Sequence, residues 1–315
     1  MSLSYKKGIL LVELEGTPGT AETLVVGDGG LVITDIQPSW DVSLLKRNAI
    51  TQDFGQLAAV SGSFAGGITF ETELKGSGSA GVADAILDDL LQLVGFGAGV
   101  VVADTSVTYD LVSVDMPKGT LAFDLQESDG SDGPRFMIYG AVGNLVISGI
   151  VNEFMKLRFE MRGILAPAAD VTPLSPTFGS VIPPVLRNGT FTLGAAARKG
   201  RSFEINLNNR ITFNPDINAS RGFAFAEITD REPTATLAME YTKVGTHNFQ
   251  GVLEANTEAA MVIKTPVAAG NTIQLSATKL QYVGMGLNNV DGKPIAAMQC
   301  QLNKGGTNEL EIQMT

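Results

Sequence analysis

Residues 62–97 read GSFAGGITFETELKGSGSAGVADAILDDLLQLVGFG, and this stretch decides the fold class. In Gly67–Leu74 apolar and polar residues alternate, which is the two-residue period of a half-buried strand. After a turn of small residues, Ser79 predicts the start of a helix, and Gly95 predicts its end in a left-handed conformation. The apolar side chains of this helix recur at helical spacing: Val82, Ile86, Leu90, Leu93 and Val94. The order predicts a β-layer with one packed helix.

The same stretch carries a resemblance to a known family. The run Gly67–Gly78, followed by a helix that ends in Leu93-Val94-Gly95-Phe96, is similar to the major tail tube proteins of long-tailed bacteriophages (siphophages). Further segments resemble that family in the same order along the chain: 33–38, 45–47, 54–55, 107–109, 140–161 and 228–234. Each segment alone is a weak signal, but their shared order and spacing make the match fairly specific.

The resemblance implies a structural protein of the virion tail rather than an enzyme, with no cofactor. Copies of such a subunit close into rings, and the rings stack into a hollow tube through which double-stranded DNA is ejected without sequence-specific binding. The implied partners are further copies of the chain, the tail terminator, the tail-tip proteins and a tape measure protein in the lumen. The alternative is another virion ring of similar fold, such as a head–tail connector or a distal tail ring.

Composition limits the function independently. The chain has 315 residues, and 22 basic against 33 acidic side chains give a net charge of −11. This excess of acidic side chains argues against a surface that binds nucleic acid. It is compatible with a tube wall past which DNA slides, and also with ordinary solubility. Cys300 is the only cysteine, so no disulfide forms within the chain, and synthesis in the host cytoplasm is expected. The apolar run at 8–14 is too short for a membrane segment.

The length predicts two domains. A proline-rich segment at 166–186 reads as an extended linker between a first β-domain, 1–165, and a second, 187–315. The second half repeats the order of the first, because the strand expected at Thr234–Tyr241 is also followed by a turn and a short helix. We therefore predict a mainly β protein built from two tandem tube-type β-sandwich or barrel domains, each with one packed α-helix.

One segment is expected to contact the next ring. Leu31–Ile36 reads as a strand that Pro38 ends, and Asp41–Ala59 then lacks any clear period. Connections of this length are usually functional or disordered. We expect it to reach an adjacent ring through the side chains Trp40, Lys46, Arg47 and Phe54. Trp40 has two alternatives, a core or loop-base anchor and an anchor at a subunit interface.

Two outward rows are candidates for the lumen. One holds Thr69, Glu71 and Glu73, and the other holds Arg158, Glu160 and Arg162. Both rows cannot face the lumen without placing arginines against DNA. We expect a net negative lumen lined by Thr69, Glu71 and Glu73.

Other chemistry has weak support. His247 is the only histidine, Cys300 lies in an expected strand as a small core residue, and no nucleophile elbow is present. The acidic loop 127–134 lacks the pattern of a calcium loop, and no metal is expected. A secreted carbohydrate binder, a different functional class, would call for exposed aromatic clusters that the sequence does not provide.

The two-domain prediction bears on ring stoichiometry. If each half contributes one wall segment, three chains close a ring of pseudo-sixfold symmetry, a pseudo-hexamer. In the competing arrangement six chains form the ring and the second half decorates its outside. We favour the trimer, because the second half carries its own strand–turn–helix unit.

Overall fold

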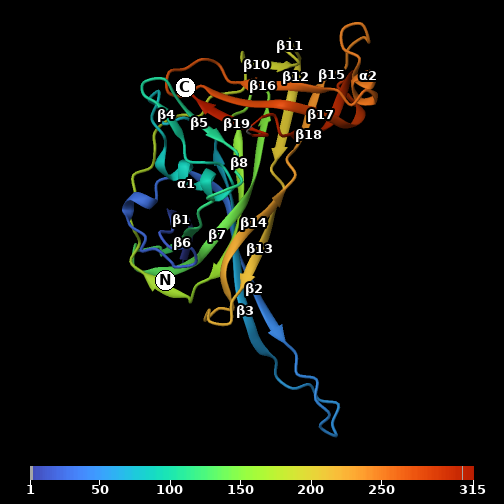
Figure 1. The fold of residues 1–315 in the computed structure, drawn as a ribbon. Coiled ribbons are helices and arrows are strands. Elements are labelled where there is room, and N and C mark those ends of the chain that lie inside the picture. The colour runs from blue at the N-terminus through green and yellow to red at the C-terminus, as the bar shows by residue number, and fades with distance from the viewer. Residues whose placement is uncertain (1–2, 307) are drawn as a thin grey trace.

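The computed structural model describes residues 3–306 and 308–315, and it is mainly β, as predicted (Figure 1). The first half contains β1 (Leu3–Leu14), η1 (Val26–Asp28), β2 (Ile33–Leu45), β3 (Val60–Glu73), α1 (Ala85–Leu93), β4 (Val100–Val102), β5 (Ser106–Asp110), β6 (Gly119–Glu127), β7 (Gly133–Ile150), β8 (Lys156–Leu165) and β9 (Ala169–Val171). The second half contains β10 (Thr190–Leu193), β11 (Ala196–Ala197), β12 (Gly200–Asn206), β13 (Asn209–Pro215), β14 (Phe223–Arg231), β15 (Thr234–Glu240), α2 (Phe249–Glu254), β16 (Glu258–Lys264), β17 (Ile273–Val290), β18 (Lys293–Asn303) and β19 (Glu311–Met314).

The two halves share one hydrogen-bonded sheet. Its central strands pair antiparallel in the order β2-β3-β8-β7-β12-β15-β18-β17. The pairing of β7 with β12 joins the halves, and β19 returns to pair with β5 of the first half. The predicted helix in each half is present, while the division into two domains stays a prediction.

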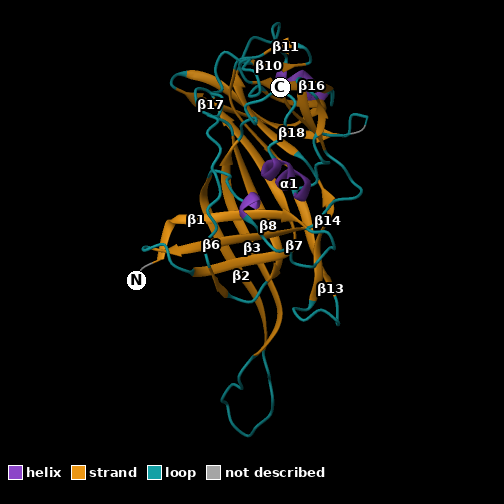
Figure 2. Ribbon diagram, turned by 90° about the vertical axis from the view of Figure 1, so that its left-hand side faces the viewer, coloured by secondary structure: helices purple, strands orange, loops and turns teal. Residues whose placement is uncertain are grey.

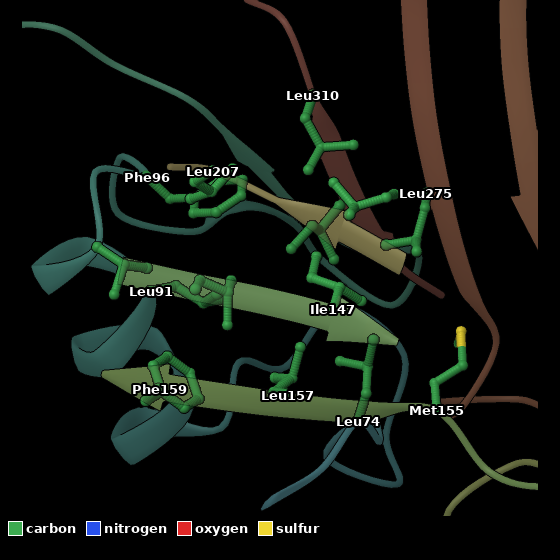
Figure 3. Close-up of a cluster of buried hydrophobic side chains, with 14 of the residues drawn as sticks. Leu74, Leu91, Phe96, Ile147, Met155, Leu157, Phe159, Leu207, Leu275 and Leu310 are labelled. Atoms are coloured by element: carbon green, nitrogen blue, oxygen red, sulfur yellow. The ribbon is translucent and has the colours of Figure 1, made fainter. Parts of the chain in front are cut away.

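A second layer covers one face of this sheet. β1 pairs with β6, and both cross the long strands of the first half, with α1 beside them (Figure 2). Apolar side chains of both halves meet in a single core, in which Leu74 and Ile147 lie near Leu275 and Leu310 (Figure 3). Phe70 and Phe159, paired across β3 and β8, stack with their ring centroids 5.2 Å apart. This core fixes the orientation of the sheet, so that its other face carries the polar rows.

Helix α1 is shorter than the sequence predicts. It begins after Asp84, whose carboxylate accepts a hydrogen bond from the Leu87 amide, so Asp84 rather than Ser79 is the N-cap. Val82 lies before the helix and is exposed. Gly95 follows the helix with a φ of +98°, which confirms the predicted left-handed end. Four leucines of α1 are buried, and each contributes about 1.5–3 kcal/mol.

The acidic face of α1 is half-buried rather than fully solvated. Burial, followed by the negative charges of Glu13 and Asp88, raises the pKa of Asp89 to about 7. Because the folded state binds this proton more tightly than the unfolded chain does, ionisation of Asp89 lowers the free energy of unfolding. The loss grows as the pH rises from about 4 towards 7 and is complete above that range.

Replacing Asp89 with asparagine is expected to remove this penalty. The free energy of unfolding should rise by about 1 kcal/mol at pH 8, a value discounted for solvent screening, and should change little near pH 4. Urea denaturation at both pH values measures the difference. A stabilisation of equal size at the two values would contradict the assignment.

The strands are longer than the sequence predicts. β2 continues through Pro38 to Leu45, because the proline lies on an outer edge where no N–H is needed for pairing with β3. The connection is therefore limited to 46–59. β7 and β17 are each continuous over 18 residues, because bulges such as that between Tyr139 and Val142 break the alternation without ending the pairing.

The proline-rich segment 166–186 runs over the surface and is mostly without regular structure, apart from β9. The Gly179 amide donates to the Gly30 carbonyl at 3.4 Å, which holds the segment to the first half. The Asn271 side-chain amide donates to the Ile182 carbonyl at 2.8 Å, which holds it to the second. The segment thus follows a defined path between the halves.

Candidate assembly surfaces

The β2–β3 hairpin forms an arm that projects from the body (Figure 1). Its tip is the loop 46–59, in which Ile50 and Phe54 are fully exposed. Lys46 and Arg47 stand at the start of the loop, and no salt bridge within the described residues includes either. An isolated chain gains nothing from two bare apolar side chains on an extended arm, so this tip has the character of a contact surface.

Trp40 lies within β2 rather than at the base of a loop. Its indole packs edge-on against Phe136 of β7, with ring centroids 4.8 Å apart, yet 64% of the residue is exposed. The core alternative for Trp40 is therefore wrong for the single chain. Its role in contacts between rings stays a prediction.

The two predicted outward rows lie side by side on one face of the sheet. β3 pairs with β8 so that Thr69 is opposite Glu160 and Glu71 is opposite Arg158. Paired residues point to the same side of a sheet, so the two rows share one face and would face a lumen together. The sequence could not reveal this, because it depends on which strands become neighbours and in which register.

Carboxylates lie beside the three cations of β8 on this face. Lys156 Nζ lies 3.3 Å from Glu71 Oε2, Arg158 Nη2 lies 2.9 Å from Glu160 Oε1, and Arg162 Nη1 lies 3.9 Å from Asp41 Oδ2. Such exposed pairs add little stability, at most about 1 kcal/mol each. Their consequence is electrostatic, because the arginines that would attract phosphates already face acids.

The face as a whole carries an excess of negative charge. The residues that share the side of Glu71 across the central strands include six acids, Asp41, Glu71, Glu73, Glu160, Glu204 and Glu240. They include five bases, Lys156, Arg158, Arg162, Lys279 and Lys293. Six minus five gives a net charge of −1 per chain. The second half contributes mostly uncharged side chains here, such as Thr236 and Gln299, which are paired across β15 and β18.

Both ends of the central sheet are open edges within the described residues. β2 pairs only with β3, and β17 beyond Tyr282 pairs only with β18. The last six residues of β17, from Met285 to Val290, are exposed on both faces of the strand. An open edge offers unpaired N–H and C=O groups that can join another strand.

His247 and Cys300 do not form a catalytic pair. His247 precedes α2, and its ring nitrogens lie 3.0 Å from Arg198 Nη2 and 3.2 Å from Tyr282 Oη. Cys300 is buried, as predicted, and burial raises its thiol pKa to about 12, so the thiol stays protonated at neutral pH. Arg198 also lines a pocket of about 320 Å³ beside β10, β12 and β16.

The acidic loop between β6 and β7 is organised by its own side chains. Asp129 accepts hydrogen bonds from the Ser131 amide and hydroxyl, at 3.0 and 2.7 Å. In the parts of the chain that the structure describes, no three acidic, histidine or cysteine side chains converge on a possible metal position. No helix in those parts is long and apolar enough to cross a bilayer.

Comparison with protein families decides the identity of this architecture. The family model described as phage tail tube protein matches residues 6–314 and so covers nearly the whole chain, including both halves. The chain belongs to the phage tail tube protein family. This tail tube protein is therefore a structural component of the phage tail. Among curated proteins, none matches its sequence.

Membership in the tail tube family gives the surfaces a context. A tail tube protein assembles with copies of itself, which agrees with open sheet edges at both ends of the central sheet. The family match extends through the second half, so β10–β19 belong to the matched region rather than to an added module.

Proposed function

We propose that this chain is the major tail tube subunit, whose copies close into rings that stack into the hollow tube through which phage DNA is ejected. The observation that carries the proposal is the central sheet, which runs without interruption through both halves and ends in an open edge on each side. Closing such a sheet through neighbouring copies removes both edges, as a barrel does.

Three chains form each ring. The pairing of β7 with β12 joins the two halves, and if each half forms one wall segment, three chains supply six segments with pseudo-sixfold symmetry. The segment 166–186 tethers the halves and gives the internal contact a high effective concentration, whereas the contact between chains depends on protein concentration. The hexamer with an outward second half remains the competing arrangement.

The polar face of the sheet lines the lumen in this proposal. Thr69, Glu71 and Glu73 lie on this face beside β8, whose basic side chains Lys156 and Arg158 are paired with carboxylates. A net negative wall repels phosphates, so DNA slides past without being held. We predict that a reconstruction of the tube will show a net negative inner surface. A net positive inner surface would contradict this assignment.

The remaining partners follow from a tube of this kind. The tape measure protein occupies the lumen before ejection, and the tail terminator and tail-tip proteins bind the end rings. Synthesis in the reducing cytoplasm of the bacterial host suits a chain whose only thiol is buried and protonated.

Electron microscopy of the purified protein tests the proposal. We expect stacked rings or hollow tubes to form at high protein concentration. Single rings that never stack would favour the alternative, a connector or tail-tip ring. A monodisperse monomer at all concentrations would overturn both.

A further inference from the structure

The contact within the chain joins β7 to β12, two strands whose counterparts in the other half lie at the open edges of the sheet. β3 and β15 both precede a helix and end in glutamate, Glu73 and Glu240. In the first half, Glu73 pairs with Lys156 of β8, which pairs with Ser148 of β7. In the second half, Glu240 pairs with Ile295 of β18, which pairs with Asn288 of β17. The observed registers thus make β7 equivalent to β17, and Ile147 equivalent to Leu287.

The same reasoning makes β2 equivalent to β12. Thr69 and Thr236 hold matching positions in β3 and β15, and they pair with Gln37 and Glu204. Continuing along these strands, Pro38 is equivalent to Ile205 and Ser39 to Asn206. One more step makes Trp40 equivalent to Leu207.

The equivalent residues differ sharply in burial. Ile147 and Leu145 of β7 are 0% exposed, and so are Ile205 of the facing strand β12 and Leu207 just after that strand. Their counterparts Leu287 and Met285 are 58% and 37% exposed, and Trp40 is 64% exposed. Three of these four apolar positions buried at the internal seam are therefore exposed at an open edge, and the fourth, Pro38, which corresponds to Ile205 in this comparison, is partly buried. Such exposure is expected if the same seam re-forms between two copies.

We propose that the open edge of β17 pairs antiparallel with β2 of the next copy, in the register that joins β7 to β12. This inference rests on the proposed function. Inside the chain, Glu204, Ile205 and Asn206 face Ser148, Ile147 and Val146. Between chains, Asn288 therefore faces Gln37, Leu287 faces Pro38, and Gly286 faces Ser39. Trp40 covers Met285 in this arrangement, so it belongs to the seam within a ring.

The backbone groups agree with this register. The Leu207 amide donates to the Leu145 carbonyl at 3.1 Å, so alternate residues of β12 point their backbone groups towards β7. In β2 the corresponding groups belong to Ile36, Pro38 and Trp40. The Ile36 carbonyl already accepts a hydrogen bond from the Tyr5 hydroxyl, and Pro38 has no N–H. The seam between chains therefore has fewer backbone bonds than the internal one and relies more on Trp40 and Leu287.

Cysteine pairs test the register. Ser39 and Gly286 form a non-hydrogen-bonded pair in it, which places Cα atoms about 4.5 Å apart, within disulfide range. A Cβ added at Gly286 meets only Ala297, at ordinary contact distances of 3.8 and 3.9 Å. We expect the variant Ser39→Cys with Gly286→Cys to oxidise into covalent oligomers that end at a closed trimer on a denaturing gel. The control, Ser39→Cys with Leu287→Cys, places the two thiols on opposite faces and should not crosslink.

A second variant tests the seam without crosslinking. Leu287→Arg should leave the melting temperature of the single chain unchanged, because the side chain is exposed there, and should raise the protein concentration needed for ring formation at least tenfold. Val267→Arg, at an apolar residue that is 86% exposed in the loop between β16 and β17, is the matched control. If the unmodified protein forms no rings, the proposed function is overturned. If it forms rings, but the 39–286 pair stays reduced or Leu287→Arg assembles normally, the β17–β2 pairing alone is overturned.

Discussion

Replacing Lys46 and Arg47 together with glutamate is expected to yield a folded subunit that no longer forms tubes. Both cations lie at the start of the exposed loop 46–59, away from the core, so the substitution has no reason to disturb folding. In the proposed tube they meet carboxylates of the adjacent ring, and reversal of both charges replaces attraction by repulsion. Electron microscopy and sedimentation report assembly, and a thermal melt reports folding.

Net charge alone must be excluded as the cause. Each replacement of a base by glutamate changes the charge by −2, so the double variant moves from −11 to −15. The double variant Lys243→Glu with Lys304→Glu gives the same −15 at two exposed lysines outside the arm. We expect this control to form tubes as the unmodified chain does. If the Lys46 and Arg47 variant forms tubes of normal length, these two cations of the arm are not needed for ring stacking.

Placing a charge in the internal seam is expected to have the largest effect on stability. Ile205→Asp buries a carboxylate opposite Ile147, where both side chains are fully buried. The variant should lose about 4 kcal/mol or more of the free energy of unfolding, because an unpaired buried charge has no compensation. Ser202→Asp, on the opposite face of the same strand, should cost less than about 1 kcal/mol.

Chemical denaturation compares the two aspartate variants directly. An Ile205→Asp protein as stable as the Ser202→Asp protein would show that β12 and β7 do not depend on each other. The contrast with Leu287, the counterpart of Ile147, is informative, because this exposed position at the outer edge should tolerate a charge in the single chain and reject it only in the ring.

Local signals in the sequence predicted the elements whose stability is local. The alternation in Gly67–Leu74 predicted the C-terminal part of β3, and Gly95 predicted where α1 ends. The N-cap was misplaced, because Ser79 and Asp84 are both good caps and only packing of the leucines of α1 against the sheet selects Asp84. Pro38 was misread as a strand end, because an edge strand needs no donor on its open side.

Long-range pairing could not be predicted in the same way. The register that sets Glu71 opposite Arg158 joins residues far apart in the chain. The sequence alone therefore could not predict that the cations of β8 lie beside carboxylates on this face. The seam between β7 and β12 likewise depends on two strands separated by the proline-rich segment. The family resemblance anticipated a tube subunit, but only these registers identify which edges remain open.

The symmetry of an assembled ring, determined by electron cryomicroscopy, tests the central claim most directly. Three chains in threefold but not sixfold symmetry, with both halves of each chain lining the lumen, is the result expected if the pairing of β7 with β12 is repeated between chains. Six chains per ring, with the second half facing outward, would contradict it.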